Sequence, residues 1–300
     1  MFQVKNKLPG ILLLTCLIAL AGCSSQLEQD TEQYMSNMES VHNTEEEFNS
    51  EVNALDYEYL PDELSSSNED VDVGRLQEIR THLEDDILPL TEQMSEDIEA
   101  VEVNNEELTE LYDSYSESVE MKHKFSTQLY EYVDAYLKSE QSNEQLINLS
   151  QSFMDNQDER SNVIEAASSE TETEEIDQLI EQINTNSEEL DDETMLLQGD
   201  ESIEEKQTHI EEVIMPLINE HIDSLNTMNL QTESAIRVRS LSLEMYYGFE
   251  KYYQERKATM MQNKKLQNLQ LQNILEMTDT FEKLDENYHE QLNEIESELE

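Results

Sequence analysis

A short stretch in the last quarter of the chain combines aromatic rings with a cation. Within eleven positions lie six large or charged residues, the candidate binding strip: Tyr246, Tyr247, Phe249, Tyr252, Tyr253 and Arg256. Aromatic faces of this kind stack on sugars or on a partner peptide, and an arginine binds anionic groups. Because six such side chains cannot all point into one core, we expect some of them to be exposed.

A structural role accounts for the same residues. Most tyrosines and basic residues of the chain lie in 105–139 and 231–264, where apolar residues recur at helical spacing. In a helical bundle, tyrosine rings fill the core with their hydroxyls at its edge, and cations offset acidic neighbours. We favour this structural role, and recognition of a partner by the candidate binding strip stays open.

No arrangement of residues predicts catalysis or a metal centre. No serine lies in a nucleophile-elbow pattern, and no glycine-rich loop is present that could hold a phosphate. The six histidines include no pair with ligand spacing on a helix. His82 and His209 have acidic neighbours, which a solvated helix face explains better than metal binding. We therefore expect no catalytic residue, no metal site and no enzyme activity.

The start of the chain carries a different chemistry. An apolar run at 11–20, too short to span a bilayer, is followed by Leu20-Ala21-Gly22-Cys23. Small residues before a cysteine at this place resemble the lipobox of bacterial lipoproteins. The resemblance implies that residues 1–22 are a signal peptide and that Cys23 carries a covalent diacylglyceryl group, which anchors stably through two acyl chains. It places the protein on the extracytoplasmic face of the cell membrane, with no other cofactor.

The charge and cysteine content of the chain limit the partners and cross-links that are possible. Against 71 acidic residues stand 17 basic ones, so the net charge is −54. The predicted leader contains two of the lysines and no acid, so residues 23–300 carry −56. Such a surface repels nucleic acid, which we exclude as a partner. Cys16 leaves with the leader and Cys23 is acylated, so no cysteine remains for a disulfide.

Apolar spacing predicts an all-α fold. Few glycines and prolines indicate long helices with short connections. In the first helix, apolar residues recur every seven positions at Leu27, Tyr34, Val41 and Phe48, with Met38 and Val52 at the second seam position. In the last helix the same spacing occurs at Ile274, Phe281 and Tyr288, as in a coiled coil. Ser142-Asn143-Glu144-Gln145 predicts a new helix through a capping box. The spacing predicts a short helix from 176 to 190 and longer helices at 26–53, 75–103, 105–139, from 142, 201–229, 231–264 and 266–300.

An internal repeat organises these helices. Residues 76–103 and 203–230 align without gaps at an offset of 127, matching Pro89-Leu90 to Pro216-Leu217. We predict two tandem repeat-related units in an elongated bundle, helical unit 1 at 23–166 and helical unit 2 at 176–300, joined by a linker at 167–175. A proline inside a helix removes a backbone donor and clashes with the preceding turn, so we expect a kink at both prolines.

The whole pattern also resembles a family. A lipobox followed by charged amphipathic helices with pairs such as Leu111-Tyr112 and Met245-Tyr246 resembles the cell-wall-binding lipoproteins of Gram-positive bacteria related to Bacillus. The resemblance implies a non-enzymatic binding or scaffold protein at the membrane–cell wall interface. Its partners would be membrane lipid, through Cys23, and a cell-wall polymer or an extracytoplasmic protein. The alternative function is an extracytoplasmic chaperone or an accessory subunit of a membrane complex.

Overall fold

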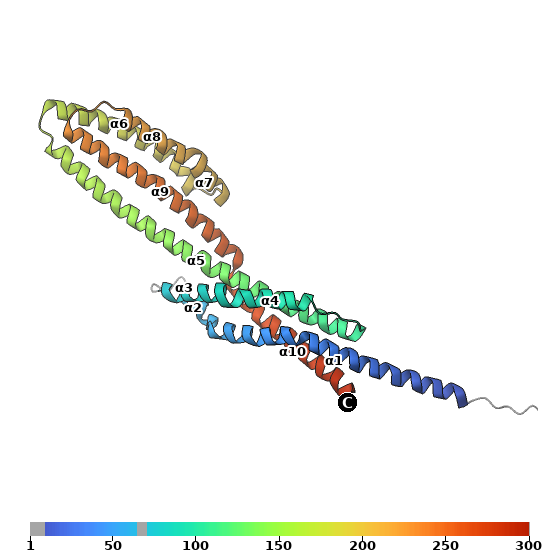
Figure 1. Cartoon of the computed structure of the whole chain (residues 1–300). Coiled ribbons are helices and arrows are strands. Elements are labelled where there is room, and N and C mark those ends of the chain that lie inside the picture. The colour runs from blue at the N-terminus through green and yellow to red at the C-terminus, as the bar shows by residue number, and fades with distance from the viewer. Residues whose placement is uncertain (1–9, 65–70, 300) are drawn as a thin grey trace, which may run out of the picture. The chain divides into compact units, whose positions relative to one another are not determined.

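The structure is a computed structural model that describes the backbone of residues 10–64 and 71–299, and the side chains of 27–64 and 71–297. Within these ranges it contains helices and no strand, which confirms the predicted all-α class. The chain forms two compact units, shown together in Figure 1. Unit 1 comprises Met1–Val133 and Leu269–Glu300, and unit 2 comprises Asp134–Asn268.

Unit 1 is built from helices at both ends of the chain. It contains α1 (Gly10–Ala54), η1 (Tyr57–Tyr59), α2 (Leu60–Glu63), α3 (Val73–His82), η2 (Leu83–Ile87), α4 (Leu88–Glu99), the first part of α5 (Glu106–Ala166) and α10 (Leu271–Leu299). The ring of Phe281 on α10 lies 6.2 Å from Phe48 on α1 and 5.8 Å from Phe125 on α5. The apolar stripe predicted for the first helix is buried in this core: Tyr34, Met38, Val41, Phe48 and Val52.

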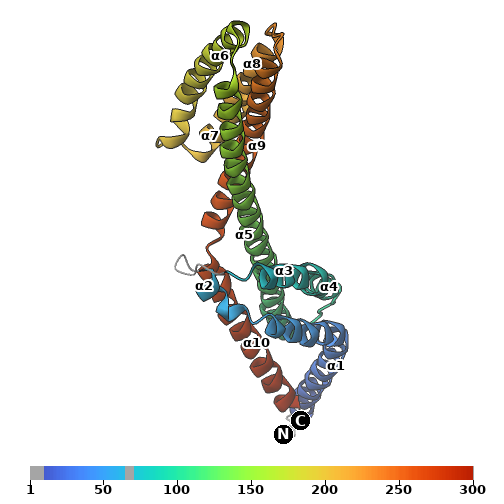
Figure 2. The ribbon, with the colours of Figure 1, turned by 90° about the vertical axis from the view of Figure 1, so that its left-hand side faces the viewer.

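Unit 2 contains the helices between these two stretches. They are the rest of α5, α6 (Glu170–Thr194), η3 (Met195–Gln198), α7 (Ile203–His209), η4 (Ile210–Ile214), α8 (Met215–Thr227) and α9 (Glu233–Leu269). Figure 2 shows α6, α8 and α9 beside the second part of α5. Ser169 and Ser202 start α6 and α7 through capping boxes, each with a glutamate three residues on. The core includes Ile176, Leu179, Ile210, Ile214, Ile218, Leu225, Val238, Tyr246 and Tyr253.

The units divide the chain differently from the predicted 23–166 and 176–300. The last helix, α10, packs in unit 1, and residues 134–166 pack in unit 2. Between them, α5 is one continuous helix across the predicted capping box at 142–145, where no glycine or proline stops it. The predicted linker 167–175 is mostly helical, because α6 begins at Glu170.

One π-helical turn precedes each of the two prolines at which the sequence predicts a kink. In unit 1 this turn spans Leu83–Ile87, two residues before Pro89, and in unit 2 it spans Ile210–Ile214, two residues before Pro216. A wider turn accommodates the proline ring, which would clash with the carbonyl four residues back in a regular α-helix. The two turns lie 127 residues apart, the same offset at which the sequence repeats.

Candidate functional site

The candidate binding strip lies on α9, where two of its members belong to the core. Tyr246 is 4 % exposed, and its ring meets His221 edge-on at 5.7 Å. Tyr253, two helical turns later, is 8 % exposed and packs in the same core. Burial raises the pKa of both phenols, to about 12 for Tyr253. These tyrosines stabilise unit 2 and are not free to bind a partner.

Two further aromatic members attach α9 to α5. The Phe249 ring lies 4.8 Å from that of Phe153 on α5, and the Tyr252 ring lies 6.3 Å from it. Gly248 makes this approach feasible, because a Cβ at that position would collide with the Phe153 ring. Phe249 and Tyr252 are only half-buried, so they cover the edge of the core and do not fill its centre.

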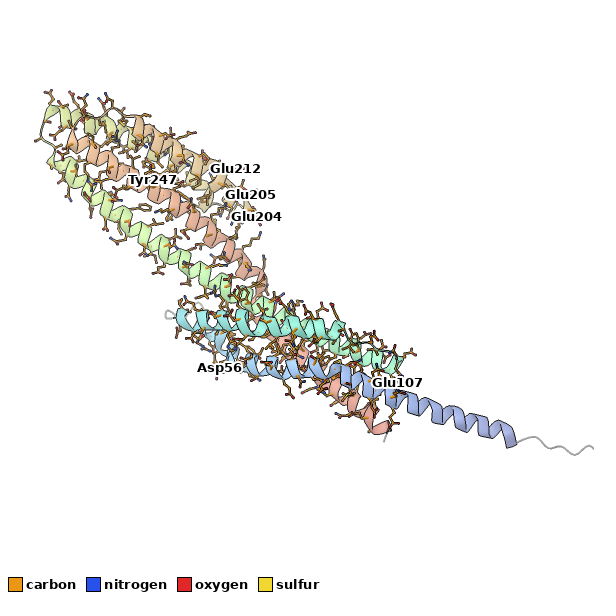
Figure 3. All side chains as sticks on the ribbon, in the orientation of Figure 1. Asp56, Glu107, Glu204, Glu205, Glu212 and Tyr247 are labelled. Carbon is orange, nitrogen blue, oxygen red and sulfur yellow. The ribbon has the colours of Figure 1, made fainter. Side chains whose placement is uncertain are left out.

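Tyr247 is the exposed ring of the strip. Half of its surface is accessible, at 49 %, and Figure 3 labels it on α9. Glu244 and Lys251 are exposed on the same helix, one turn before and one turn after it. Arg256 is half-buried, and its charge acts on Tyr253 by opposing the rise in the phenol pKa. The six residues therefore do not form one exposed face, and the surface they offer centres on Tyr247.

A polar cluster that the sequence did not reveal lies behind Tyr246. Asn186 on α6 is 1 % exposed, accepts a hydrogen bond from Gln182 at 2.8 Å and donates one to Ser224 at 3.2 Å. His221, also buried, is joined to Glu189 through Nε2 at 3.0 Å. The available signal was Asn186 itself, which continues the apolar spacing of Ile176 and Leu190 with a polar residue.

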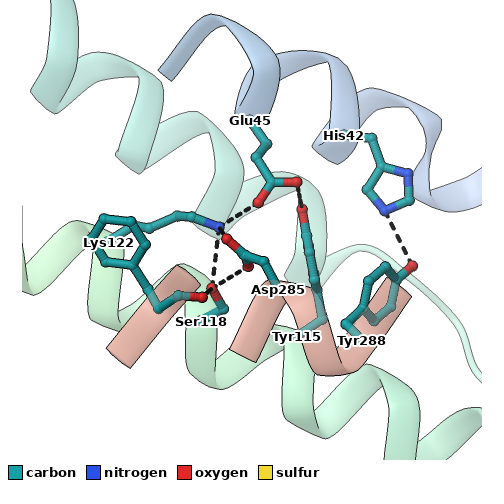
Figure 4. A network of polar contacts seen from close by, with 8 residues as sticks. His42, Glu45, Tyr115, Ser118, Lys122, Asp285 and Tyr288 are labelled. Atoms are coloured by element: carbon teal, nitrogen blue, oxygen red, sulfur yellow. Dashed lines mark hydrogen bonds and ion pairs between the residues drawn. The ribbon is translucent and has the colours of Figure 1, made fainter. Parts of the chain in front are cut away.

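A second buried network holds three helices of unit 1 together (Figure 4). Lys122 of α5 is fully buried and forms ion pairs with Glu45 of α1 and Asp285 of α10. Tyr115 donates to Glu45 at 2.5 Å, and Ser118 donates to Asp285 at 2.5 Å. The sequence placed Lys122 among cations that offset acidic neighbours, which is what it does here, although inside the core.

The pKa values of the two carboxyl groups in this network are shifted in opposite directions. Burial raises the pKa of Glu45, but the Lys122 ammonium and the Tyr115 hydroxyl outweigh it and leave the pKa below its usual value. For Asp285, burial and repulsion from Glu45 outweigh Lys122, so its pKa is raised. The Lys122 ammonium thus forms ion pairs with both carboxylates, and it stabilises the charged form of Glu45 more than that of Asp285.

The paired histidines of the repeat are held by hydrogen bonds. His82 is bonded through Nε2 to Glu51 at 2.6 Å, and His209 donates from Nε2 to the Glu193 carbonyl at 2.8 Å. Among the described side chains, no group of three or more histidine, cysteine or acidic residues is arranged to hold a metal ion. Within the same part of the chain, no helix is long and apolar enough to cross a membrane. The Cys23 side chain and the predicted leader's side chains lie outside the described residues.

These features define an all-α protein that has a lipobox-like segment at the start of its chain and a cluster of tyrosines on α9. The chain belongs to the EMYY-motif containing lipoproteins, whose family model matches residues 4–296. The four letters of that name occur here as Glu244-Met245-Tyr246-Tyr247, inside the region of the candidate binding strip. Searches of curated proteins and of solved structures found no match. Membership confirms the lipoprotein part of the resemblance, and therefore a lipid-anchored protein.

Proposed function

We propose that this lipoprotein is a non-enzymatic binding or scaffold protein on the extracytoplasmic face of the membrane, anchored through Cys23 at the membrane–cell wall interface. Its partner would be a cell-wall polymer or an extracytoplasmic protein. Membership of the lipoprotein family supports lipid anchoring, and the lipobox-like segment from Leu20 to Cys23 supports Cys23 as the acylated residue. The sequence supports the absence of catalysis, because it contains no convergent set of catalytic groups.

One observation carries the binding role. In the stretch Glu244-Met245-Tyr246-Tyr247 the two aromatic rings differ, since Tyr246 is buried in unit 2 and Tyr247 is half-exposed. The packing of unit 2 explains Tyr246 but does not require an aromatic ring at 247. An exposed tyrosine is a common anchor of binding surfaces. Tyr247 is therefore the residue through which α9 would contact a partner.

The test compares two exposed tyrosines. Tyr247→Ala should weaken retention of the mature chain on purified cell wall, or on a captured partner, by about tenfold or more, as loss of an aromatic anchor does. Tyr59→Ala is the matched control, because Tyr59 is 60 % exposed and lies in unit 1. A photoreactive group at 247 should capture the partner in cells. Equal retention of both variants would remove the strip as a binding surface, and release of wall fragments by the purified chain would contradict the non-enzymatic role.

A further inference from the structure

The distance between the anchor and the core of unit 1 is short. Thr31 on α1 is the first buried residue of the described side chains, at 4 % exposure, and Tyr34 follows at 1 %. Only seven residues, 24–30, separate Cys23 from Thr31. Cys23 and Thr31 both lie on helix α1, eight residues apart, so about 12 Å of helix separates them. With a lipid on Cys23, as the proposed function requires, the start of unit 1 cannot move farther than this from its attachment point.

Three segments of unit 1 meet at this end. Helix α4 runs antiparallel to α1, since Ser40 bonds Asp97 and His82 of the preceding α3 bonds Glu51. The connection from α4 to α5, residues 100–105, therefore lies beside the part of α1 that precedes Ser40. Helix α10 is also antiparallel to α1, because Phe281 contacts Phe48 and Tyr288 bonds His42. Its C-terminal end thus lies at the same place.

This end of unit 1 carries charge of one sign. The ranges 27–41, 95–110 and 289–297 contain no lysine and no arginine. Figure 3 labels one of their exposed acids, Glu107 at the start of α5. The exposed acids of these ranges include Glu28, Glu32, Glu102, Glu106, Glu107 and Glu294. An anionic membrane within a Debye length, about 8–10 Å at physiological salt, would repel such a surface.

We propose that the acidic end of unit 1 faces the membrane and acts as an electrostatic spacer. The short helical segment between Cys23 and Thr31 keeps this end close to the bilayer. The negative charge of the same end holds the folded core away from anionic headgroups. The separation then depends on ionic strength and on the fraction of anionic lipid. The spacer sets where unit 1 stands relative to the lipid and does not itself bind lipid.

The test attaches the chain to vesicles without relying on cellular acylation. Cys23 is the single cysteine of residues 23–300, so its thiol can be coupled to a maleimide lipid. A fluorophore on a non-natural amino acid at position 102 reports energy transfer to labelled headgroups. On phosphatidylcholine vesicles transfer should be high at every salt concentration. On vesicles that also contain phosphatidylglycerol it should be lower in dilute salt and reach the same value near ~1 M salt, where the Debye length is about 3 Å.

Charge-matched variants locate the effect. Combining Glu28→Gln, Glu32→Gln and Glu107→Gln should raise transfer on the anionic vesicles in dilute salt. The control combines Glu174→Gln, Asp177→Asn and Glu181→Gln, which removes the same charge from exposed positions on α6 and should leave transfer unchanged. Inserting a ~20-residue Gly/Ser segment after Ser25 should lower transfer on both vesicle types, because a longer linker lets unit 1 move away. Circular dichroism verifies that every variant remains helical.

The spacer proposal is contradicted if energy transfer in dilute salt is equal on the two vesicle types. It is also contradicted if the unit 1 variant and the α6 control variant change energy transfer equally. Failure of the anchor would show differently. Mass spectrometry of the protein from cells would then find Cys23 without a diacylglyceryl group, and the vesicle result would not change.

Discussion

At the scale of single residues, Lys122 connects three helices of unit 1. Its ammonium group is fully buried and is shared by Glu45 from α1 and Asp285 from α10. Ionic groups in a core are expensive to desolvate, so such a network adds less stability than its contacts suggest. The network also constrains how α1, α5 and α10 align, because each of these helices contributes one of its three charges.

Lys122→Met should lower the free energy of unfolding by about 3–5 kcal/mol, since it leaves two buried carboxylates without their cation. Urea unfolding followed by circular dichroism measures this loss. Adding Glu45→Gln and Asp285→Asn to Lys122→Met should restore much of it. Lys257→Met serves as control, because both side chains of the Lys257–Glu211 pair are exposed and the pair should contribute less than about 1 kcal/mol. A loss as small as that of the control would mean that the network is not a stabilising charge cluster.

Substitution of Gly248 tests the contact between α5 and α9. Alanine favours a helix over glycine by about 1 kcal/mol, but its Cβ would collide with the Phe153 ring. Overpacking of this kind costs about 1–3 kcal/mol, so Gly248→Ala should lower the free energy of unfolding by about 1 kcal/mol in denaturant titrations. In a Phe153→Ala background the same substitution should be stabilising. If Gly248→Ala stabilises the parent chain, the two helices are not in close contact at this point.

At the scale of helices, the sequence predicted what depends on local spacing. The buried stripes of α1 and α10 lie where heptad spacing placed them, and the ends of α9 are close to the predicted 231–264. The predicted capping box at Ser142 was wrong, because a serine followed by glutamine also fits inside a long helix when no breaker is present. Which unit receives α10 depends on contacts such as Tyr288 with His42, which are 246 residues apart and leave no local signal.

The candidate site was predictable to a similar extent. Composition drew attention to the aromatic stretch of α9, and helical geometry required some of its side chains to be exposed. Which ring is exposed depends on the position of α5 and α8 around α9, because Phe153 and His221 decide it by packing against Phe249 and Tyr246. Neither neighbour could be assigned from the spacing within α9.

The break between α9 and α10 supplies a test at this scale. Gln270 adopts a positive φ of 46°, a left-handed conformation that costs an L-residue about 1–2 kcal/mol. Gln270→Gly should therefore raise the free energy of unfolding by about 0.5–1 kcal/mol after the entropy of glycine in the unfolded chain is subtracted. Gln291→Gly, at an exposed position inside α10, should instead lower it by about 1 kcal/mol. Thermal unfolding of both variants measures the difference, and a Gln270→Gly loss that equals the control would contradict the strained break.

At the scale of the whole molecule, the net charge of −54 opposes the compact state. Salt screens this repulsion, so the melting temperature should rise between about 0.01 M and about 1 M sodium chloride, where the Debye length falls from about 30 Å to about 3 Å. Sucrose at matched osmolality separates screening from solute exclusion, and it should raise the melting temperature less. A melting temperature that does not depend on salt would show that the acidic side chains are too far apart to interact.

The division of unit 1 into two distant stretches has a consequence for biogenesis. Residues 1–133 leave the ribosome long before 269–300, yet α10 supplies Phe281, Tyr288 and Asp285 to the same core. Until the last segment is synthesised, Phe48 and Tyr115 lack their covering rings and Lys122 lacks one of its counterions. A ribosome that stops early therefore releases a chain in which only unit 2 has all its helices, and unit 1 stays open to proteolysis.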